Sequence, residues 1–151
     1  MSSKKRSSSK KKKSTAAPAI PPTLIRLFNE EDFEKYVVSL KGSALVAVVS
    51  PINATTCSAV LSGLEQLNSN RGPALAETNL CVVFANKDSA ALCERLQVST
   101  SPYFESFSYG NSVFKFSGDS MEKAVLIATH ASQAAVEEGA RLAQEAANAE
   151  A

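Results

Sequence analysis

Residues 44–67 read Ala-Leu-Val-Ala-Val-Val-Ser-Pro-Ile-Asn-Ala-Thr-Thr-Cys-Ser-Ala-Val-Leu-Ser-Gly-Leu-Glu-Gln-Leu, and this stretch decides the fold. Its first six residues form a continuous apolar run rich in β-branched side chains, which is typical of a strand buried on both faces. After the break at 50–53, apolar residues recur at helical spacing, so we expect a helix capped by Thr55 or Thr56. A buried strand therefore leads to Cys57 at the start of a helix, where unpaired backbone amides favour a thiolate.

Length and cysteine content limit the possible classes of protein. A chain of 151 residues can form one domain with a substantial core, and its apolar runs are too short to span a membrane. No hydrophobic signal segment follows the basic start, so we expect a cytoplasmic protein. Three cysteines without a repeated C-x-x-C pair fit a reducing compartment and argue against a disulfide framework or a zinc site. We therefore expect no cofactor, metal or membrane contact, and we interpret the only histidine, His130, as a residue on a helix face.

The first 22 residues differ in composition from the rest of the chain. Residues 1–15 hold seven of the sixteen basic side chains and no acidic one, whereas the remainder has nine basic and fifteen acidic residues. We expect residues 1–22 to be a disordered basic arm with a Pro-rich linker, either without a specific partner or binding a polyanion. The polyanion would be nucleic acid, the acidic surface of tubulin or an import receptor. The candidate polyanion-binding residues are Lys4, Lys5, Arg6, Lys10, Lys11, Lys12 and Lys13.

The remaining segments alternate between strand and helix patterns. We expect strands at 24–28, 44–49 and 80–85, with a helix after each at 30–40, 55–67 and 90–96. Asn29 is expected to cap the first of these helices. A hairpin is expected from two strands at 103–109 and 113–116, and a last helix from Ser120. The order βαβαβαββα predicts an α/β domain with a mixed sheet.

This order resembles the thioredoxin family over residues 23–131. The resemblance rests on the strand-to-helix turn at 50–57 and on residues 96–104, which look like the family segment that contains a cis-proline. Gly110 and Gly118 also fall at the family's spacings. The resemblance implies a thioredoxin-like mixed sheet flanked by helices, with a cis bond before Pro102 and a peptide-binding groove beside it. The residues implied for the groove are Asn53, Ala54, Thr55, Ser101 and Pro102.

The motif at the active site departs from the family that the chain resembles. When Cys57 is placed on the second cysteine of C-x-x-C, Ala54 falls on the attacking cysteine and the family's buried aspartate falls near Val48. Disulfide exchange needs an attacking thiolate and a second, resolving thiol, so we expect the dithiol reaction to be lost. Cys81 and Cys93 are expected to be small core residues. Cys57 is the candidate thiol if the protein is redox-active.

Three functional classes remain open. We favour a redox-inactive, thioredoxin-like interaction or structural subunit of a larger assembly that is anchored by the basic arm. The first candidate is a microtubule-associated assembly of the cytoskeleton or of a ciliary or flagellar axoneme, with tubulin or axonemal proteins as partners. The alternatives are a monothiol redox protein that uses Cys57 and a ribonucleoprotein subunit, which could be nuclear. The aromatic residues of the hairpin alternate as buried strand residues do and form no obvious base-stacking platform: Phe104, Phe107, Tyr109, Phe114 and Phe116.

Residues 132–151 are expected to extend the last helix beyond the thioredoxin-like domain. They are rich in Ala, Glu, Gln and Arg, which are good helix formers. Val136, Ala140, Ala143 and Ala147 share one face at helical spacing. This extension would either fray into solvent or protrude and dock on a partner.

Overall fold

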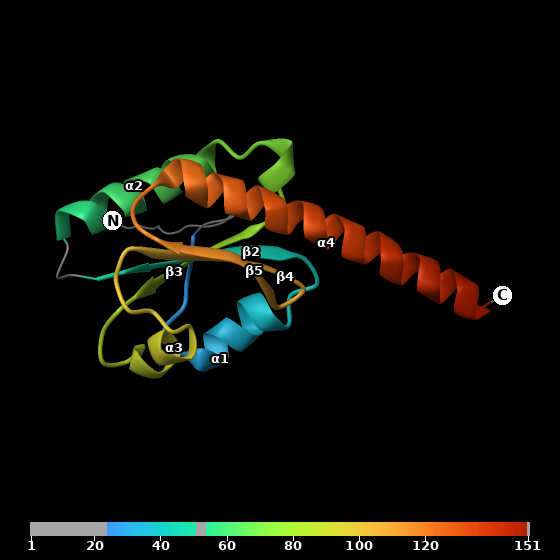
Figure 1. The fold of residues 1–151 in the computed structure, drawn as a ribbon, viewed down its shortest axis with the longest axis horizontal. Coiled ribbons are helices and arrows are strands. Elements are labelled where there is room, and N and C mark those ends of the chain that lie inside the picture. Colours follow the sequence, from blue (N-terminus) through green and yellow to red (C-terminus); the bar gives the residue numbers. More distant parts are fainter. Residues whose placement is uncertain (1–23, 51–53, 151) are drawn as a thin grey trace, which may run out of the picture.

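The computed structural model describes residues 24–50 and 54–150 (Figure 1). Within this part of the chain, strands and helices alternate up to the final hairpin and helix. The strands are β1 (Ile25–Arg26), β2 (Ser43–Val49), β3 (Asn79–Phe84), β4 (Tyr103–Ser108) and β5 (Asn111–Ser117). The helices are α1 (Glu30–Phe33), its π-helical continuation η2 (Glu34–Val38), α2 (Ala54–Ser69), the 3₁₀ turn η4 (Pro73–Leu75), α3 (Ala90–Arg95) and α4 (Met121–Glu150).

The strands form one mixed sheet in the order β1-β3-β2-β4-β5. The first three of these are parallel to one another, whereas β4 runs antiparallel to β2, and β5 runs antiparallel to β4. All seven residues of the central strand β2 are buried. The continuous apolar run therefore predicted a central strand correctly, because helices cover both faces of the sheet.

The helices lie in two layers, with α2 and α4 on one face of the sheet and α1 and α3 on the other (Figure 1). Side chains of β2 alternate between the two cores. Leu45, Ala47 and Val49 pack with α2 and α4, whereas Ala44, Val46 and Val48 belong to the core beneath α1 and α3. The mixed sheet flanked by helices, predicted from the sequence, is confirmed.

Of the two helix caps predicted from the sequence, one is confirmed and one is wrong. The Asn29 side chain accepts a hydrogen bond of 2.9 Å from the Asp32 amide, as predicted, and the Asp32 carboxylate accepts another from the Phe28 amide. The assignment of Thr55 or Thr56 as a cap is wrong. Because α2 already includes Ala54, both threonines lie inside its first turn.

Gly110 connects β4 to β5 and must be glycine for two reasons. Its φ of +81° lies in the left-handed region. A Cβ atom at this position would also lie 2.5 Å from the carbonyl oxygen of Val38. The hairpin turn therefore packs directly against the end of η2.

The hairpin aromatics are not all buried, contrary to the prediction. Phe104 and Phe107 are buried, but Phe114 is half exposed. β5 is the edge strand next to β4, and α4 packs mainly on β2 and β4, so the helix covers Phe114 only in part. The Phe114 ring instead meets the His130 ring edge-on, with 5.4 Å between the ring centroids.

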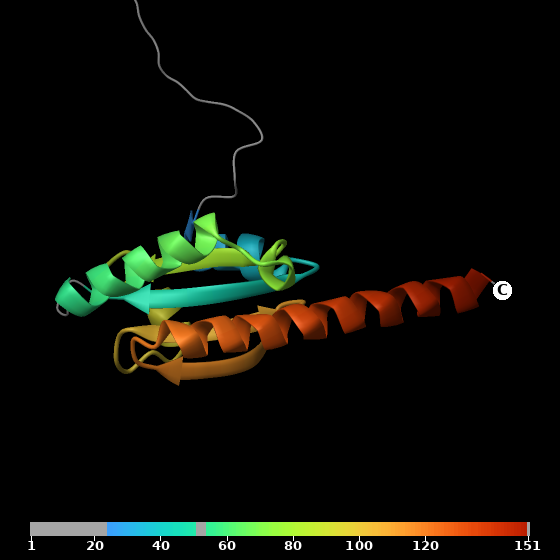
Figure 2. The ribbon, with the colours of Figure 1, turned by 90° about the horizontal axis from the view of Figure 1, so that it is seen from above.

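Helix α4 extends well past the sheet (Figures 1 and 2). Its first part packs on β2 and β4 through Ala124, Ile127 and Ala128, and residues 140–149 are exposed. In the extension, Arg141 pairs with Glu138 and Glu145 along the helix. The extended C-terminal helix predicted from composition is confirmed. None of the described helices has both the length and the apolar character that a bilayer crossing needs.

Candidate functional site

The candidate thiol lies where the sequence places it, after the central strand and in the first turn of α2. The Cys57 side chain is only 6% exposed and belongs to the same core cluster as Val49, Val60 and Leu64. The Cys57 side chain thus faces the core beneath α2 and not the solvent.

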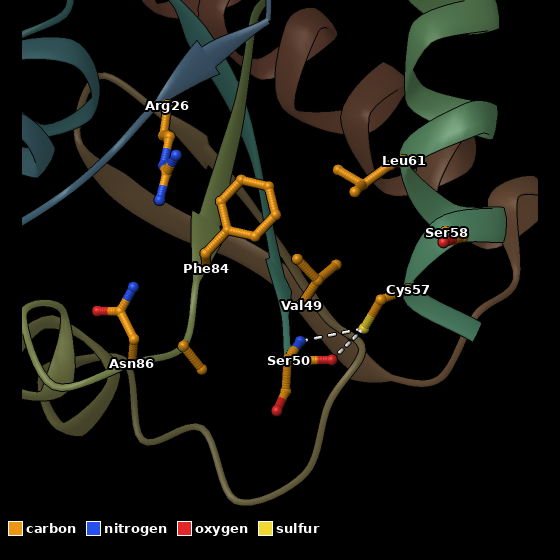
Figure 3. A pocket seen from close by; sticks show the side chains of 9 residues that line it. Arg26, Val49, Ser50, Cys57, Ser58, Leu61, Phe84 and Asn86 are labelled. Atoms are coloured by element: carbon orange, nitrogen blue, oxygen red, sulfur yellow. Dashed lines mark hydrogen bonds between the residues drawn. The ribbon is translucent and has the colours of Figure 1, made fainter. Parts of the chain in front are cut away.

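Two hydrogen bonds join the Cys57 sulfur to the backbone of Ser50 (Figure 3). The Ser50 amide donates to Sγ at 3.0 Å, and the thiol donates to the Ser50 carbonyl oxygen at 2.9 Å. The second bond requires a hydrogen on the sulfur, since a thiolate would face the carbonyl oxygen with like charge. The sulfur thus bonds both the amide and the carbonyl of Ser50, just past the end of β2.

Strand β2 places no proton acceptor beside Cys57. Val48, near which the resemblance places the family's aspartate, lies in the core on the opposite face of the sheet from Cys57. The β2 side chains on the same face as Cys57 are Leu45, Ala47 and Val49. All three are apolar, so a titratable group is missing from this face of β2.

The other two cysteines cannot reach Cys57. All three are free thiols, and Cys81 lies in the core on the opposite face of the sheet. Burial raises the pKa of the Cys81 thiol to about 12. Cys93 on α3 packs against the same core as Cys81, as a small core residue would.

The Ser101–Pro102 bond is cis, as the resemblance implied. Because Val48 lies opposite Tyr103 in the β2–β4 pairing, Pro102 lies beside the end of β2, where the chain passes to α2. Pro102 is buried, and its carbonyl accepts a hydrogen bond of 2.8 Å from the Gly118 amide. Its place beside the end of β2 agrees with the expected groove, but peptide binding there stays a prediction.

Several predicted site residues lie outside the described residues. These are Asn53 of the expected groove and all seven basic residues of the arm, Lys4, Lys5, Arg6, Lys10, Lys11, Lys12 and Lys13. Thr55 is exposed in the first turn of α2, and Ala54 is its first residue. His130 is exposed on α4. The described ranges contain no cluster of three side chains suited to hold a metal ion.

A pocket lies between α2 and the ends of β1 and β3 (Figure 3), which sequence reasoning missed. Its volume is about 380 Å³. One sequence signal could have suggested it, namely the charged Arg26 within the apolar strand 24–28. The lining residues are Arg26, Val49, Ser50, Cys57, Ser58, Leu61, Phe84, Ala85 and Asn86.

Arg26 is held against this pocket by two aromatic rings. Its guanidinium carbon lies 4.4 Å from the ring centroid of Phe28 and 4.4 Å from that of Phe84, so both contacts are cation–π interactions. Arg26 takes part in none of the ion pairs found among the described residues. No carboxylate lines the described part of the pocket.

A buried carboxylate on the other side of the sheet also escaped the sequence reading. Glu105 on β4 is only 6% exposed and accepts a hydrogen bond of 2.7 Å from the Tyr103 hydroxyl. Burial, with this hydrogen bond and the charge of Glu105, raises the pKa of Tyr103. The pair lies two residues apart on one face of β4, so the phenol satisfies the carboxylate locally.

Solved structures with a similar architecture include several thioredoxins. Thioredoxin from Malassezia sympodialis is 14% identical with a TM-score of 0.63, and the match covers 77% of this chain and 97% of that protein. Fasciola hepatica thioredoxin is 18% identical with a TM-score of 0.61, and the match covers 71% of this chain and 98% of that protein. Thioredoxin f from spinach chloroplast is 18% identical with a TM-score of 0.62, and the match covers 79% of this chain and 98% of that protein.

Comparison at the level of sequence gives a different result. No protein-family model matches the sequence, and no curated protein sequence matches it significantly. At these low identities the structural likeness establishes the architecture and not the chemistry. This chain has the thioredoxin fold.

Proposed function

We propose that this chain is a thioredoxin-fold interaction subunit of a larger assembly and that it does not catalyse dithiol–disulfide exchange. One observation carries the second half of this proposal. The Cys57 thiol is buried and is hydrogen-bonded in both directions to the backbone of Ser50. A sulfur in this position has a structural task and is shielded from a disulfide substrate.

Exchange chemistry also needs two thiols that can meet. An attacking thiolate forms a mixed disulfide, and a second thiol then displaces the first product. Here the residue three positions before Cys57 is alanine, and Cys81 and Cys93 pack on the opposite face of the sheet. A mixed disulfide formed at Cys57 would therefore have no resolving thiol within the chain.

Reduction of insulin by thioredoxin reductase and NADPH tests this proposal. We expect no turnover by the wild-type protein and weak turnover by Ala54→Cys, which restores a C-x-x-C pair. The matched control is Ala59→Cys, which adds a thiol at an exposed position on the same helix. Turnover by the wild type at the rate of an ordinary thioredoxin would contradict the proposal.

Alkylation with iodoacetamide near neutral pH separates a structural thiol from a monothiol enzyme. We expect Cys57 to react more slowly in the native protein than in the protein unfolded in urea, because its sulfur is buried. If Cys57 instead reacts faster than a free cysteine, the monothiol redox function replaces the one proposed here.

The proposal of an assembly subunit is supported by charge and shape. The seven basic residues of the arm contrast with the acidic remainder of the chain, and α4 continues as an exposed helix beyond the sheet. We propose that the arm binds a polyanionic surface, with the acidic surface of microtubules as the first candidate.

Co-sedimentation with microtubules tests this part of the proposal. We expect binding that falls steeply with salt and that is lost on deletion of residues 1–15. A variant with the seven basic residues of the arm changed to glutamine is the matched control, because it removes the charge of the arm and keeps its length. Tight RNA binding without microtubule binding would favour the ribonucleoprotein alternative instead.

A further inference from the structure

We propose that the pocket between α2 and the ends of β1 and β3 binds a small apolar molecule that carries a carboxylate. This proposal does not depend on the proposed function. The pocket has a volume of about 380 Å³, and small-molecule sites typically occupy about 300–1,000 Å³. Such sites combine apolar walls with a few polar groups that orient the ligand, and the pocket has this composition.

The apolar walls come from three different elements. Val49 at the end of β2, Leu61 on α2 and Phe84 at the end of β3 line the cavity. The Cys57 sulfur adds a weakly polar surface, since its hydrogen bonds are already made to Ser50. A hydrocarbon chain or ring would therefore replace water in this pocket favourably.

Arg26 supplies the charge that selects the ligand. The rings of Phe28 and Phe84 fix its guanidinium, and a planar guanidinium can bind a carboxylate through two parallel hydrogen bonds. Cys57 in the first turn of α2 and the adjacent Ser58 also line the cavity, so the pocket lies near the positive end of the helix dipole. With no acidic side chain in the described lining, the pocket is positive as well as apolar.

Comparison with Arg95 shows why Arg26 is different. Arg95 also lies over an aromatic ring, with its guanidinium 4.9 Å from the centroid of Phe33. However, Arg95 is neutralised by Glu30 and Glu34, at N–O distances of 3.5 Å and 2.6 Å. Arg26 has no such ion pair among the described residues, so its guanidinium can donate hydrogen bonds to an external carboxylate.

The arrangement of the side chains suggests the orientation of the ligand. Figure 3 shows Arg26 and Asn86 on one side of the pocket and Leu61 and Cys57 across from them. The carboxylate is expected near the Arg26 guanidinium and the Asn86 amide. The apolar body is expected to lie along Phe84 toward α2.

Titration of the full chain with octanoate tests the proposal, and octanol serves as the uncharged ligand of matched length. Amide NMR spectra locate binding and calorimetry measures affinity. We expect saturable shifts confined to the pocket residues. Octanoate should bind about tenfold or more tightly than octanol, the effect of a charge-assisted bond to one arginine.

Three variants assign the effect to this site. Arg26→Met keeps an apolar stem and removes the charge, so it should lower octanoate affinity to that of octanol and leave octanol binding within about twofold. Ala85→Leu reduces the pocket volume and should weaken both ligands. Arg95→Met is the control and should change neither affinity.

Several results would overturn the proposal. These are the absence of saturable binding, shifts that cluster away from the pocket, equal affinity for octanoate and octanol, and equal effects of Arg26→Met and Arg95→Met. Should Arg26→Met fail to fold, Arg26→Lys decides, since it keeps the charge but loses the fork of donors. It should then bind octanoate more weakly than the wild type and still more tightly than octanol.

Discussion

Substitution of Cys57 by serine and by alanine tests whether its thiol is structural. The thiol donates a hydrogen bond to the Ser50 carbonyl oxygen at 2.9 Å and accepts one from the Ser50 amide at 3.0 Å. Alanine removes both bonds, each worth about 0.5–1.5 kcal/mol. It also removes the buried sulfur atom, worth roughly 0.8 kcal/mol by analogy with a methylene. We therefore expect Cys57→Ala to lower the free energy of unfolding by about 2–3 kcal/mol.

Serine should be the milder change at this position. Its hydroxyl can donate and accept in the same directions as the thiol, although the shorter C–O bond lengthens both contacts. We expect Cys57→Ser to cost about 1 kcal/mol, mainly from lost sulfur packing. A smaller loss of stability with serine than with alanine is unusual at a buried cysteine, because a hydroxyl in an apolar core normally lacks a hydrogen-bond partner.

Cys81 provides the internal control. It is buried in the opposite core, and no hydrogen bond of its sulfur is found within the described ranges. Cys81→Ser should therefore lower the free energy of unfolding by about 1–3 kcal/mol more than Cys81→Ala, which is the cost of an unsatisfied buried hydroxyl.

Urea unfolding of the four variants under reducing conditions, followed by circular dichroism, gives the free energies. The reasoning fails if Cys57→Ser is more destabilising than Cys57→Ala by about 1 kcal/mol or more, as predicted for Cys81.

Three further predictions concern the rest of the molecule. Gly110→Ala should cost about 3 kcal/mol or more in urea unfolding, because its Cβ would meet the Val38 carbonyl at 2.5 Å in a left-handed backbone conformation; Gly72→Ala, with open space around it, should stay within about 0.5 kcal/mol of the wild type. Burial raises the pKa of Cys81 to about 12, so the stability that this thiol contributes is fully present below about pH 9 and is lost as the pH rises toward 12. The free energy of unfolding should fall by up to about 1.4 kcal/mol per pH unit in this range, and Cys81→Ala should remove this slope. Deletion of residues 141–151 should leave the thermal midpoint within about 2 °C, since the side chains of residues 141–149 are exposed and surface ion pairs contribute little; a larger fall would show that the extension folds back on the domain.

The fold was predictable because its main elements obey local rules. The apolar run of β2 predicted a central strand, and the composition of residues 132–151 predicted a continued helix. The cap formed by Asn29 could be predicted from this residue and its neighbours in the sequence alone. Each of these signals is contained within a few consecutive positions, so no knowledge of packing was needed.

The site was harder to predict because it depends on which face a side chain occupies. Alternation along β2 places Val48 and Val49 on opposite faces, but the sequence does not show which of them faces Cys57. The exposure of Phe114 depends on β5 being an edge strand, which is a property of the whole sheet. Likewise, Arg26 lines a pocket only because Phe28 and Phe84 hold it there.

The pocket and the helical extension lie at opposite ends of the sheet, which bears on how the protein could use both. The pocket forms at the end of β2, next to Val49 and Ser50. Helix α4 leaves the sheet at the other end, where a Cβ on Gly139 would lie 3.2 Å from the Tyr109 hydroxyl. Tyr109 follows Ser108, which lies opposite Ser43 at the start of β2. A partner bound to the exposed part of α4 (Figure 1) would therefore leave the pocket open, and a ligand in the pocket would leave the extension free to bind that partner.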